Sequence, residues 1–458
     1  MADANNDDLA AVGRRVNAVV RSEQATLIVA RFFAELQGRA ARHLADGTVF
    51  LVTGDIPAMW LRDSAAQLMP LLRVGGGPQA EQFAVAVLRR QLEYIRLDPY
   101  ANAFNPRPNG AGHHRDLTEP SCPRHRAWVW ERKYEVDSLC YPLLVAYRIW
   151  RRYGRADIFD PRFWGAVERI LHTWETEQDH ERLSAYRFRR PRVPVPGARS
   201  GALPSVFAGL LPGVLGGPLA RGGRGPEVAV TGMTWSGFRP SDDPVRYGYN
   251  VPGNLFASAV LGRLAEIAVA VRPPRAAELL TRIRRLRGAI DTGVARYALV
   301  DDPRTGQRWA YEVDGRGGAL EMDDANLPSL LALPLLGCCR PDDPVYTATR
   351  EFVLSERNPY YFRGPAARGV GSPHTPRRHV WPLAIAAAAL TSTDPADRRA
   401  AIDTLLNTHA GTTRIHESFH ADRPATWTRA WFSWAEAMFC ELVLDHCGYR
   451  HSDAPSSG

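Results

Sequence analysis

Most hydrophobic positions of this chain recur at helical spacing. One such series, in which neighbours stand three or four residues apart, is Phe256, Val260, Leu264, Ile267 and Val271. This period predicts amphipathic α-helices that each bury one face. Strand-like alternation is scarce, and only 308–313 is expected to form the arm of a hairpin. The pattern therefore predicts an all-α protein.

Six helical segments share one kind of opening, in which a polar stretch is followed by a proline and then by an apolar run. These prolines directly follow Ile56, Tyr141, Val251, Leu327, Trp381 and Arg423. Proline suits the first turn of a helix, because the N–H that it lacks would have no partner there. Six helix pairs around a ring would bring the six polar stretches to one end. The pattern predicts an (α/α)6 toroid with few short strands in its loops. The alternative is a general helical fold in which the prolines coincide by chance.

The domain organisation follows from the same pattern. A length of 458 residues suits two or three ordinary domains or one large repetitive domain. The ring favours a single catalytic domain over 1–448. Two stretches without a helical period, 110–126 and 191–226, are expected to be loop insertions, and 449–458 a frayed tail.

Composition narrows the class of protein. We find no apolar run long enough to span a membrane and no signal peptide at the N-terminus, which predicts a cytoplasmic protein without a membrane partner. None of the six cysteines forms a Cys-x-x-Cys pair, so free thiols are expected. The net charge of +8 comes from scattered arginines, with Lys133 as the one lysine, and no basic stripe indicates a nucleic-acid partner.

The most informative segment is the loop 231–243, with the sequence TGMTWSGFRPSDD. Loops held by a rigid scaffold often carry functional sites. The carboxylates of Asp242 and Asp243 repel each other, so one of them is expected to keep a raised pKa and to serve as a proton donor. The alternative is an acidic surface turn, but that would leave Trp235 and Phe238 exposed without benefit.

A second segment, 414–422, contains a literal H-E-x-x-H in His416, Glu417 and His420. On a helix this pattern would bind zinc, with the glutamate as a base. Its glycine- and proline-rich surroundings favour a loop, in which Glu417 is a base and the histidines bind polar substrate groups. A purely structural hydrogen-bonded turn is the third interpretation.

Three further segments have residues that suit hydroxyl groups. Arg62 offers a planar fork of donors, Asp63 accepts hydrogen bonds, and Trp60 offers an apolar platform for a sugar ring. His374 stands in a rigid turn, and Asp323 belongs to an acidic cluster before a helix. A helix-start salt bridge, a surface histidine and an N-cap cluster are the respective alternatives. The segment 131–137, with its three carboxylates, suits a pocket wall or a helix cap.

The sequence contains no phosphate-binding loop, no dinucleotide fingerprint and no Gly-x-Ser-x-Gly elbow. Carboxylates, arginine, aromatic rings and hydroxyl-binding groups on a helical ring fit carbohydrate chemistry. Glycosidases use two carboxyl groups, which stand about 6.5–9.5 Å apart in inverting enzymes and about 5 Å apart in retaining ones.

Five segments resemble glycoside hydrolase family 125, and the likeness extends over about 56–444. They are 54–64, 130–141, 231–243, 322–329 and 416–420. The resemblance implies an (α/α)6 fold and an inverting, metal-independent exo-α-1,6-mannosidase without a cofactor. Its substrate would be terminal α-1,6-linked mannose on oligosaccharides or N-glycan fragments. The implied general acid is Asp242, with Asp243 as the close second, and the implied base is Glu417.

The remaining candidate residues are expected to hold the terminal mannose. They are Trp60, Arg62, Asp63, Trp235, Ser236, Asp243, Asp323, His374 and His420. Competing functions are another helical-toroid enzyme, such as a glucosidase or sugar phosphorylase, a zinc peptidase using the H-E-x-x-H segment, and a non-catalytic sugar-binding module. The two insertions depart from the family pattern, which leaves open the preference for the sugar beyond the cleaved bond.

Overall fold

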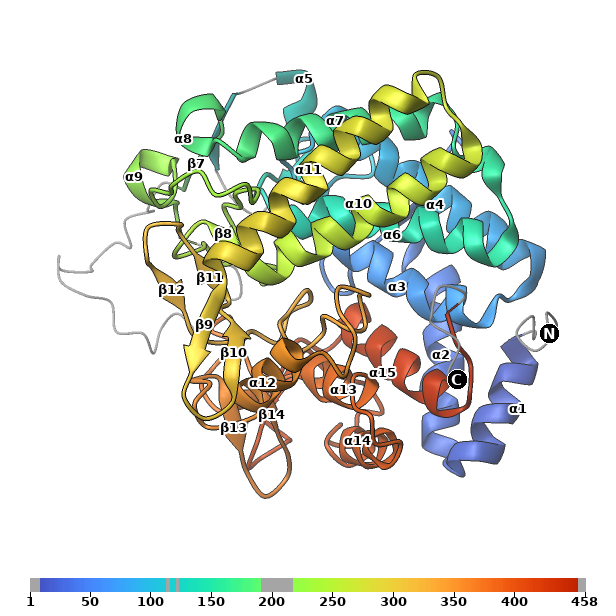
Figure 1. Ribbon diagram of the computed structural model, residues 1–458. Coiled ribbons are helices and arrows are strands. Elements are labelled where there is room, and N and C mark those ends of the chain that lie inside the picture. Colours follow the sequence, from blue (N-terminus) through green and yellow to red (C-terminus); the bar gives the residue numbers. More distant parts are fainter. Residues whose placement is uncertain (1–8, 113–115, 121–122, 191–216, 452–458) are drawn as a thin grey trace, which may run out of the picture.

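The structure is a computed structural model that describes residues 9–112, 116–120, 123–190 and 217–451 (Figure 1). In these residues, outer and inner helices alternate along the chain. The outer helices are α2 (Glu23–Gln37), α4 (Gly77–Leu97), α7 (Pro161–Glu177), α11 (Ala276–Tyr297), α12 (Pro344–Val353) and α14 (Ala396–Asn407). The inner segments are α3 (Leu61–Val74), α6 (Val136–Tyr153), α10 (Val251–Val271), residues 329–337, α13 (Pro382–Leu390) and α15 (Ser433–His446). The six outer–inner pairs confirm the predicted toroid.

Burial separates the two layers. Every residue of α3 is buried, whereas α11 buries a single stripe that includes Ile283, Leu286 and Ile290. Around the ring, α6 contacts both α10 and α3, α3 contacts α15, and α15 contacts α13. The inner helices are therefore covered on all sides, and each outer helix packs an amphipathic face onto them.

Helix α10 differs from one expectation. It is long and apolar enough to span a membrane by length and composition, with a mean hydropathy of 1.5. Half of that window is buried, and the helix packs against α6 and α11 (Figure 1). Its place in the ring accounts for its apolar character, and the cytoplasmic location stays a prediction.

Three small antiparallel sheets stand at the starts of the inner helices. They are β3-β4-β6 (Met59–Trp60, Ala103–Phe104, Val129–Glu131), β12-β11-β8 (Ala319–Leu320, Glu312–Val313, Tyr249–Asn250) and β15-β16-β17 (His379–Val380, Ser418–His420, Trp427–Thr428). Strand β3 leads directly into α3, and β8 leads directly into α10. Strands β6, β15 and β17 end a few residues before α6, α13 and α15. The sheets therefore gather the polar stretches at one end of the ring.

The other strands form two-stranded pairs. These are β1-β2 (Ala41–His43, Val49–Leu51), β9-β10 (Leu299–Asp302, Gly306–Trp309), β13-β14 (Tyr361–Arg363, Arg368–Val370) and β5-β7 (Leu117–Glu119, Arg187–Arg189). The segment 308–313 is not one hairpin arm, because it spans the end of β10 and all of β11, which pair in different sheets. The remaining helices are α1 (Leu9–Val20), α5 (Pro123–Arg126), α8 (His180–Leu183), α9 (Ala220–Gly223) and the 3₁₀ turn η1 (Ala156–Ile158).

The proline openings are only partly as predicted. Pro252 and Pro382 lie in the first turn of α10 and α13. Pro142 lies inside α6, because that helix begins earlier, at Val136. The segment after Pro328 packs as an inner element but forms successive turns in place of an α-helix.

The expected frayed tail is wrong for residues 449–451. Tyr449 is fully buried, and its carbonyl accepts a hydrogen bond from Arg73 Nη1 at 3.1 Å. His451 Nε2 lies 2.7 Å from Glu441 Oε2. The rest of the tail and the part of the 191–226 insertion up to 216 lie outside the described residues, and the single-domain boundary stays a prediction.

Candidate active site

The sheet β3-β4-β6 places three chain segments beside one another. Its register aligns Trp60, Ala103 and Glu131 in one row. Just beyond this row, Asn102 Oδ1 accepts a hydrogen bond from the backbone N–H of Lys133 at 3.1 Å. The carbonyl of Asn102 accepts another from the N–H of Leu61, the first residue of α3. The starts of α3 and α6 are thereby fixed around Asn102.

Arg62, on the first turn of α3, stands at the centre of a group of four carboxylates. Its Nη1 lies 2.6 Å from Glu135 Oε2 and 3.3 Å from Asp137 Oδ2. Its Nε lies 3.5 Å from Asp63 Oδ2, and its Nη2 lies 3.7 Å from Asp242 Oδ1. Burial would lower the pKa of Arg62, but these anions raise it well above its usual value. One buried cation therefore organises this side of the site.

Glu135 and Asp242 form a coupled carboxyl pair. Asn102 Nδ2 donates to Asp242 Oδ1 at 2.9 Å and to Glu135 Oε1 at 3.3 Å. Burial raises the pKa of Glu135 well above its usual value despite Arg62. Burial would also raise the pKa of Asp242, but Lys133, a hydrogen bond with Glu135 and the Arg62 charge lower it. The two carboxyls therefore share one buried environment, in which burial acts to raise the pKa of both and the neighbouring cations act to lower it.

A tight turn presents the Asp242 side chain. The N–H of Asp242 donates to the Arg239 carbonyl at 2.9 Å, and the N–H of Arg239 donates to the Asp243 carbonyl at 2.8 Å. Asp242 has a φ of 65°, a left-handed conformation that is costly for a residue with a Cβ and that clusters at functional sites. Its side chain is 21% exposed, whereas the other three carboxylates around Arg62 are nearly enclosed.

His374 links Asp243 to the opposite side of the site. Its Nδ1 lies 3.4 Å from Asp243 Oδ1. Burial would lower the pKa of His374, but Asp243, Glu417 and Asp242 raise it to about 9. Burial would raise the pKa of Asp243, but His374 and Lys133 lower it. The expectation that one carboxyl of the Asp242–Asp243 pair keeps a raised pKa is therefore wrong, because surrounding cations outweigh their mutual repulsion.

The sheet β15-β16-β17 supplies Glu417 and Arg429. The register pairs Ser418 with Thr428, so the residues flanking this pair also face each other. Arg429 Nη1 lies 3.6 Å from Glu417 Oε1, and its Nε donates to Asp55 Oδ1 at 2.9 Å. The charge of Arg429 also acts on Asp63, while that of Glu417 acts on His374. Glu417 and Asp242 therefore belong to one electrostatic site.

The H-E-x-x-H segment does not have the geometry of a zinc site. It includes β16 and is not helical. His416 is held by its Nδ1 against the Arg429 carbonyl at 3.0 Å and by its Nε2 against Thr412 Oγ1 at 2.9 Å, with its ring stacked on Trp427. Within the described chain, no group of three or more histidine, cysteine or acidic side chains is arranged for a metal.

Three predicted sugar-binding residues are structural. Trp235 is 0% exposed, with its ring stacked on His180 at 3.7 Å, so it cannot meet a sugar. Ser236 is buried, and its Oγ donates to the Phe238 carbonyl at 2.8 Å. Asp323 is also enclosed, and accepts hydrogen bonds from the N–H groups of the first residues of the 329–337 segment. Asp323 therefore has a structural role, but it is not an N-cap, because 329–337 forms turns in place of a helix.

Two other candidates lie at the edge of the site. Trp60 is buried in a small apolar cluster with Ala58 and Ala103, against which Ile56 and Trp130 pack. His420 lies in β16, where its ring meets that of His379 and its Nδ1 accepts from the N–H of Asp422 at 3.2 Å. These contacts place His420 beside the strand pairing, away from the acidic group around Arg62.

Sequence reasoning missed several site residues. Asn102, Lys133 and Arg429 were not singled out for the site, whereas Asp324 belongs to the predicted acidic cluster before Pro328 and interacts electrostatically with Asp243. Only Lys133 had a usable signal, because it is the one lysine among 57 basic residues. The Lys133 side chain is 3% exposed, and its ammonium lies 3.1 Å from Glu131 Oε1.

Comparison with known proteins agrees with this arrangement. Residues 21–201 and 214–444 match the family described as metal-independent α-mannosidase, GH125. The Meiotically up-regulated gene 157 protein of Schizosaccharomyces pombe is 36% identical over 413 residues, which cover 88% of this chain and 78% of the relative.

Solved structures show the same relationship. A metal-independent α-mannosidase of Streptococcus pneumoniae, in a non-productive complex with α-1,6-mannobiose, has 42% sequence identity and a TM-score of 0.87, covering 96% of this chain and 98% of that one. A bacterial glucoamylase with acarbose, at 13% identity and a TM-score of 0.54, covers 87% of this chain and 50% of its own, and shares the fold alone. By the family match and the extent of these likenesses, this chain belongs to glycoside hydrolase family 125.

Proposed function

We propose that the protein is an inverting exo-α-1,6-mannosidase in which Asp242 is the general acid and Glu417 the general base. The observation that carries the proposal is that both carboxyl groups act on His374: Asp242 comes from the 239–243 turn, whose Asp243 lies 3.4 Å from His374, and Glu417 directly precedes β16. Membership of an α-mannosidase family supports mannose as the substrate. The mannobiose bound by the Streptococcus pneumoniae enzyme supports the α-1,6 linkage.

The acid step uses the Glu135–Asp242 pair. The glycosidic oxygen needs one proton as its bond to the anomeric carbon breaks. Asp242 delivers this proton to the leaving oxygen, and Glu135, which shares the Asn102 amide with Asp242 and whose pKa burial raises, is the neighbouring carboxyl that can supply it. Asp243 is less suited, because the His374 cation holds it as an anion.

The base step uses Glu417. A water molecule on the opposite face of the sugar loses a proton to this carboxylate while its oxygen bonds to the anomeric carbon. The two bond changes on opposite faces invert the configuration. Arg429 Nη1 lies 3.6 Å from Glu417 Oε1, and the hydrogen bond from Arg429 Nε to Asp55 fixes the position of this guanidinium.

The terminal mannose is held by the groups that border the two carboxyls. Arg62 and Asp63 offer a donor and an acceptor for neighbouring hydroxyls, and His374, whose side chain is 23% exposed, offers a charged donor. Trp60, just before Arg62, is buried in the apolar cluster beneath this region. The enclosed floor around Arg62 suits a chain end, which supports exo action.

The test is hydrolysis of a panel of α-linked mannobioses by the purified protein. We expect cleavage of the α-1,6 isomer without added phosphate. Glu417→Gln and Asp242→Asn should each lower kcat by about 10²–10⁴-fold, the usual contribution of acid–base catalysis, with Asp243→Asn less affected. No cleavage of any mannobiose would refute the function. Full activity of Glu417→Gln or Asp242→Asn would refute the assigned roles, and phosphate dependence would instead indicate a phosphorylase.

A further inference from the structure

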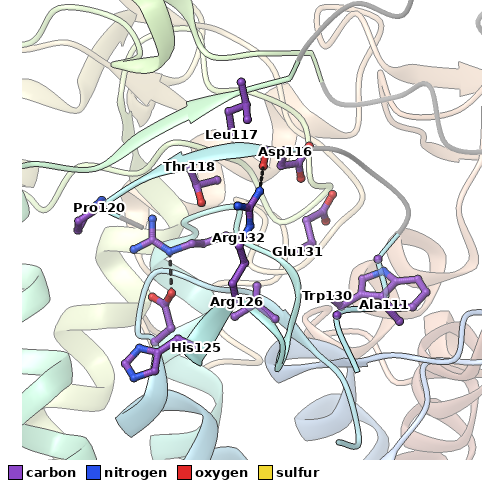
Figure 2. A pocket seen from close by; sticks show the side chains of 14 residues that line it. Ala111, Asp116, Leu117, Thr118, Pro120, His125, Arg126, Trp130, Glu131 and Arg132 are labelled. Atoms are coloured by element: carbon purple, nitrogen blue, oxygen red, sulfur yellow. Dashed lines mark hydrogen bonds and ion pairs between the residues drawn. The ribbon is translucent and has the colours of Figure 1, made fainter. Parts of the chain in front are cut away.

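A cavity lies along β6, whose following residues, Lys133 and Glu135, lie beside Asp242 in the candidate active site. Its volume is about 410 Å³, and Figure 2 shows the side chains that line it. Its walls come from 110–112, from 116–120 with β5, and from 125–132 with β6. The cavity thus belongs largely to the 110–126 insertion, to which the catalytic proposal assigns no part.

The lining is polar but balanced in charge. Arg132 Nε lies 2.6 Å from Asp98 Oδ2, and its Nη1 donates to the Glu119 carbonyl at 3.0 Å. Arg190 Nε lies 2.8 Å from Asp116 Oδ1, and its Nη2 lies 3.0 Å from Glu131 Oε1. The carboxylates thus have cation partners, which disfavours a strongly charged ligand.

The same lining suits a neutral polyhydroxylated ligand. A carboxylate oxygen that accepts from one arginine can still accept from a hydroxyl group. Trp130 adds a half-buried indole ring, and Arg126 adds an exposed guanidinium (Figure 2). The volume falls in the range of about 300–1,000 Å³ that is typical of small-molecule sites. An aromatic ring among paired charges is the chemistry that recognises a sugar.

Two connections join the cavity to the candidate active site. Glu131, in the cavity wall, pairs with Lys133 at 3.1 Å, and the charge of Lys133 acts on Asp242. Trp130 packs against the cluster that contains Trp60, next to Ile56. Trp130 therefore borders both the cluster that contains Trp60 and the cavity.

We propose that this cavity is a distal binding site for sugar units on the leaving-group side of the cleaved bond. It takes the second or third unit of a neutral mannooligosaccharide and so selects substrates longer than a disaccharide. The inference rests on the proposed function, because it needs a saccharide in the neighbouring site. It assigns a specificity role to the described cavity walls at 110–112, 116–120 and 125–132.

The test compares α-1,6-mannobiose with α-1,6-linked mannotetraose. Thr118→Trp, on β5, fills the cavity, and Arg126→Ala removes an exposed donor. Arg340→Ala is the matched control, since this exposed arginine pairs with Asp342 far from the cavity. We expect wild type and Arg340→Ala to have about tenfold higher kcat/KM on the tetraose, the effect of one or two net hydrogen bonds. Thr118→Trp and Arg126→Ala should lose that advantage while keeping their kcat/KM on mannobiose.

The proposal is overturned if wild type shows no preference for the tetraose, or if both variants keep it. It is also overturned if the variants lose activity equally on the two substrates. If no mannobiose is cleaved at all, the proposed function fails separately. In that case, saturation-transfer NMR of intact mannotetraose with wild type and Thr118→Trp tests whether the cavity binds a saccharide. Loss of the transfer signal in Thr118→Trp would support the saccharide site, and an unchanged signal would refute it.

Discussion

The pairing of His374 with Asp243 makes the stability of this protein depend on pH. The perturbation is His374→Gln, compared with wild type across pH 6 to 10. His374 has a pKa of about 9 against 6.5 for an ordinary histidine, since Asp243, Glu417 and Asp242 outweigh burial. A histidine with a raised pKa stabilises the fold fully below 6.5, and that contribution disappears as the pH rises through 9.

The magnitude follows from the shift. At about 1.4 kcal/mol per pKa unit, raising the pKa from 6.5 to about 9 corresponds to at most about 3 kcal/mol. The side chain is 23% exposed, so solvent screens part of this interaction, and we expect about 1–3 kcal/mol. The pKa of Asp243 is lowered, so Asp243 stays ionised over this pH range and the ion pair loses its carboxylate only in acid.

The assay is urea denaturation of wild type and His374→Gln at several pH values, with His172→Gln as a control at an exposed histidine. The difference in unfolding free energy should be about 1–3 kcal/mol at pH 6 and should shrink toward zero above pH 9. Other titrating groups are common to both proteins, so the difference isolates this pair. A difference that stays constant over the range, or that grows with pH, would refute the reasoning.

Three further predictions concern single features of the site. Lys133→Arg keeps the charge but forces a longer planar group into a buried site, so kcat should fall at least about tenfold and stability by about 1–3 kcal/mol; unchanged kinetics would show that any cation suffices. Trp235→Ala should lower the unfolding free energy by about 3–5 kcal/mol in a denaturation experiment, with little change in KM, and a KM rise without destabilisation would restore Trp235 as a sugar platform. Exhaustive treatment with EDTA should leave the hydrolysis rate unchanged, and loss of activity that zinc restores would contradict the assignment of Glu417.

The ring was predictable because its signals are local. The apolar period of α10 and the proline at its start can both be read without tertiary information. The stretch after Pro328 shows the limit of such signals. Its apolar residues and its place in the repeat predict a helix, but turns fill this fourth inner position along the chain, and the buried Asp323 carboxylate accepts hydrogen bonds from their N–H groups.

Trp235 was misassigned because its burial comes from distant glycines. A Cβ at Gly225 would lie 2.5 Å from the indole Cζ2, and one at Gly248 would lie 2.8 Å from its Cδ1. These close approaches enclose the ring within a segment whose composition indicates an open loop. The sequence shows where the glycines are, but it does not show which aromatic ring they approach in the fold.

Asn102 and Arg429 could not have been found from their surroundings. Asn102 becomes part of the site because β4 lies between β3 and β6. Arg429 does so because β17 pairs with β16 beside Glu417. Both depend on strand pairings of two or three residues, too short for any sequence period to reveal.

In the proposed mechanism, Asp242 and Glu417 act on opposite faces of one mannoside. Proton NMR of the sugar first released from α-1,6-mannobiose checks this arrangement, because it reports the anomeric configuration before mutarotation. We expect β-mannose to appear first and α-mannose to follow only as the anomers equilibrate. If α-mannose is released first, the two carboxyl groups do not work as an inverting pair, and the assignment fails.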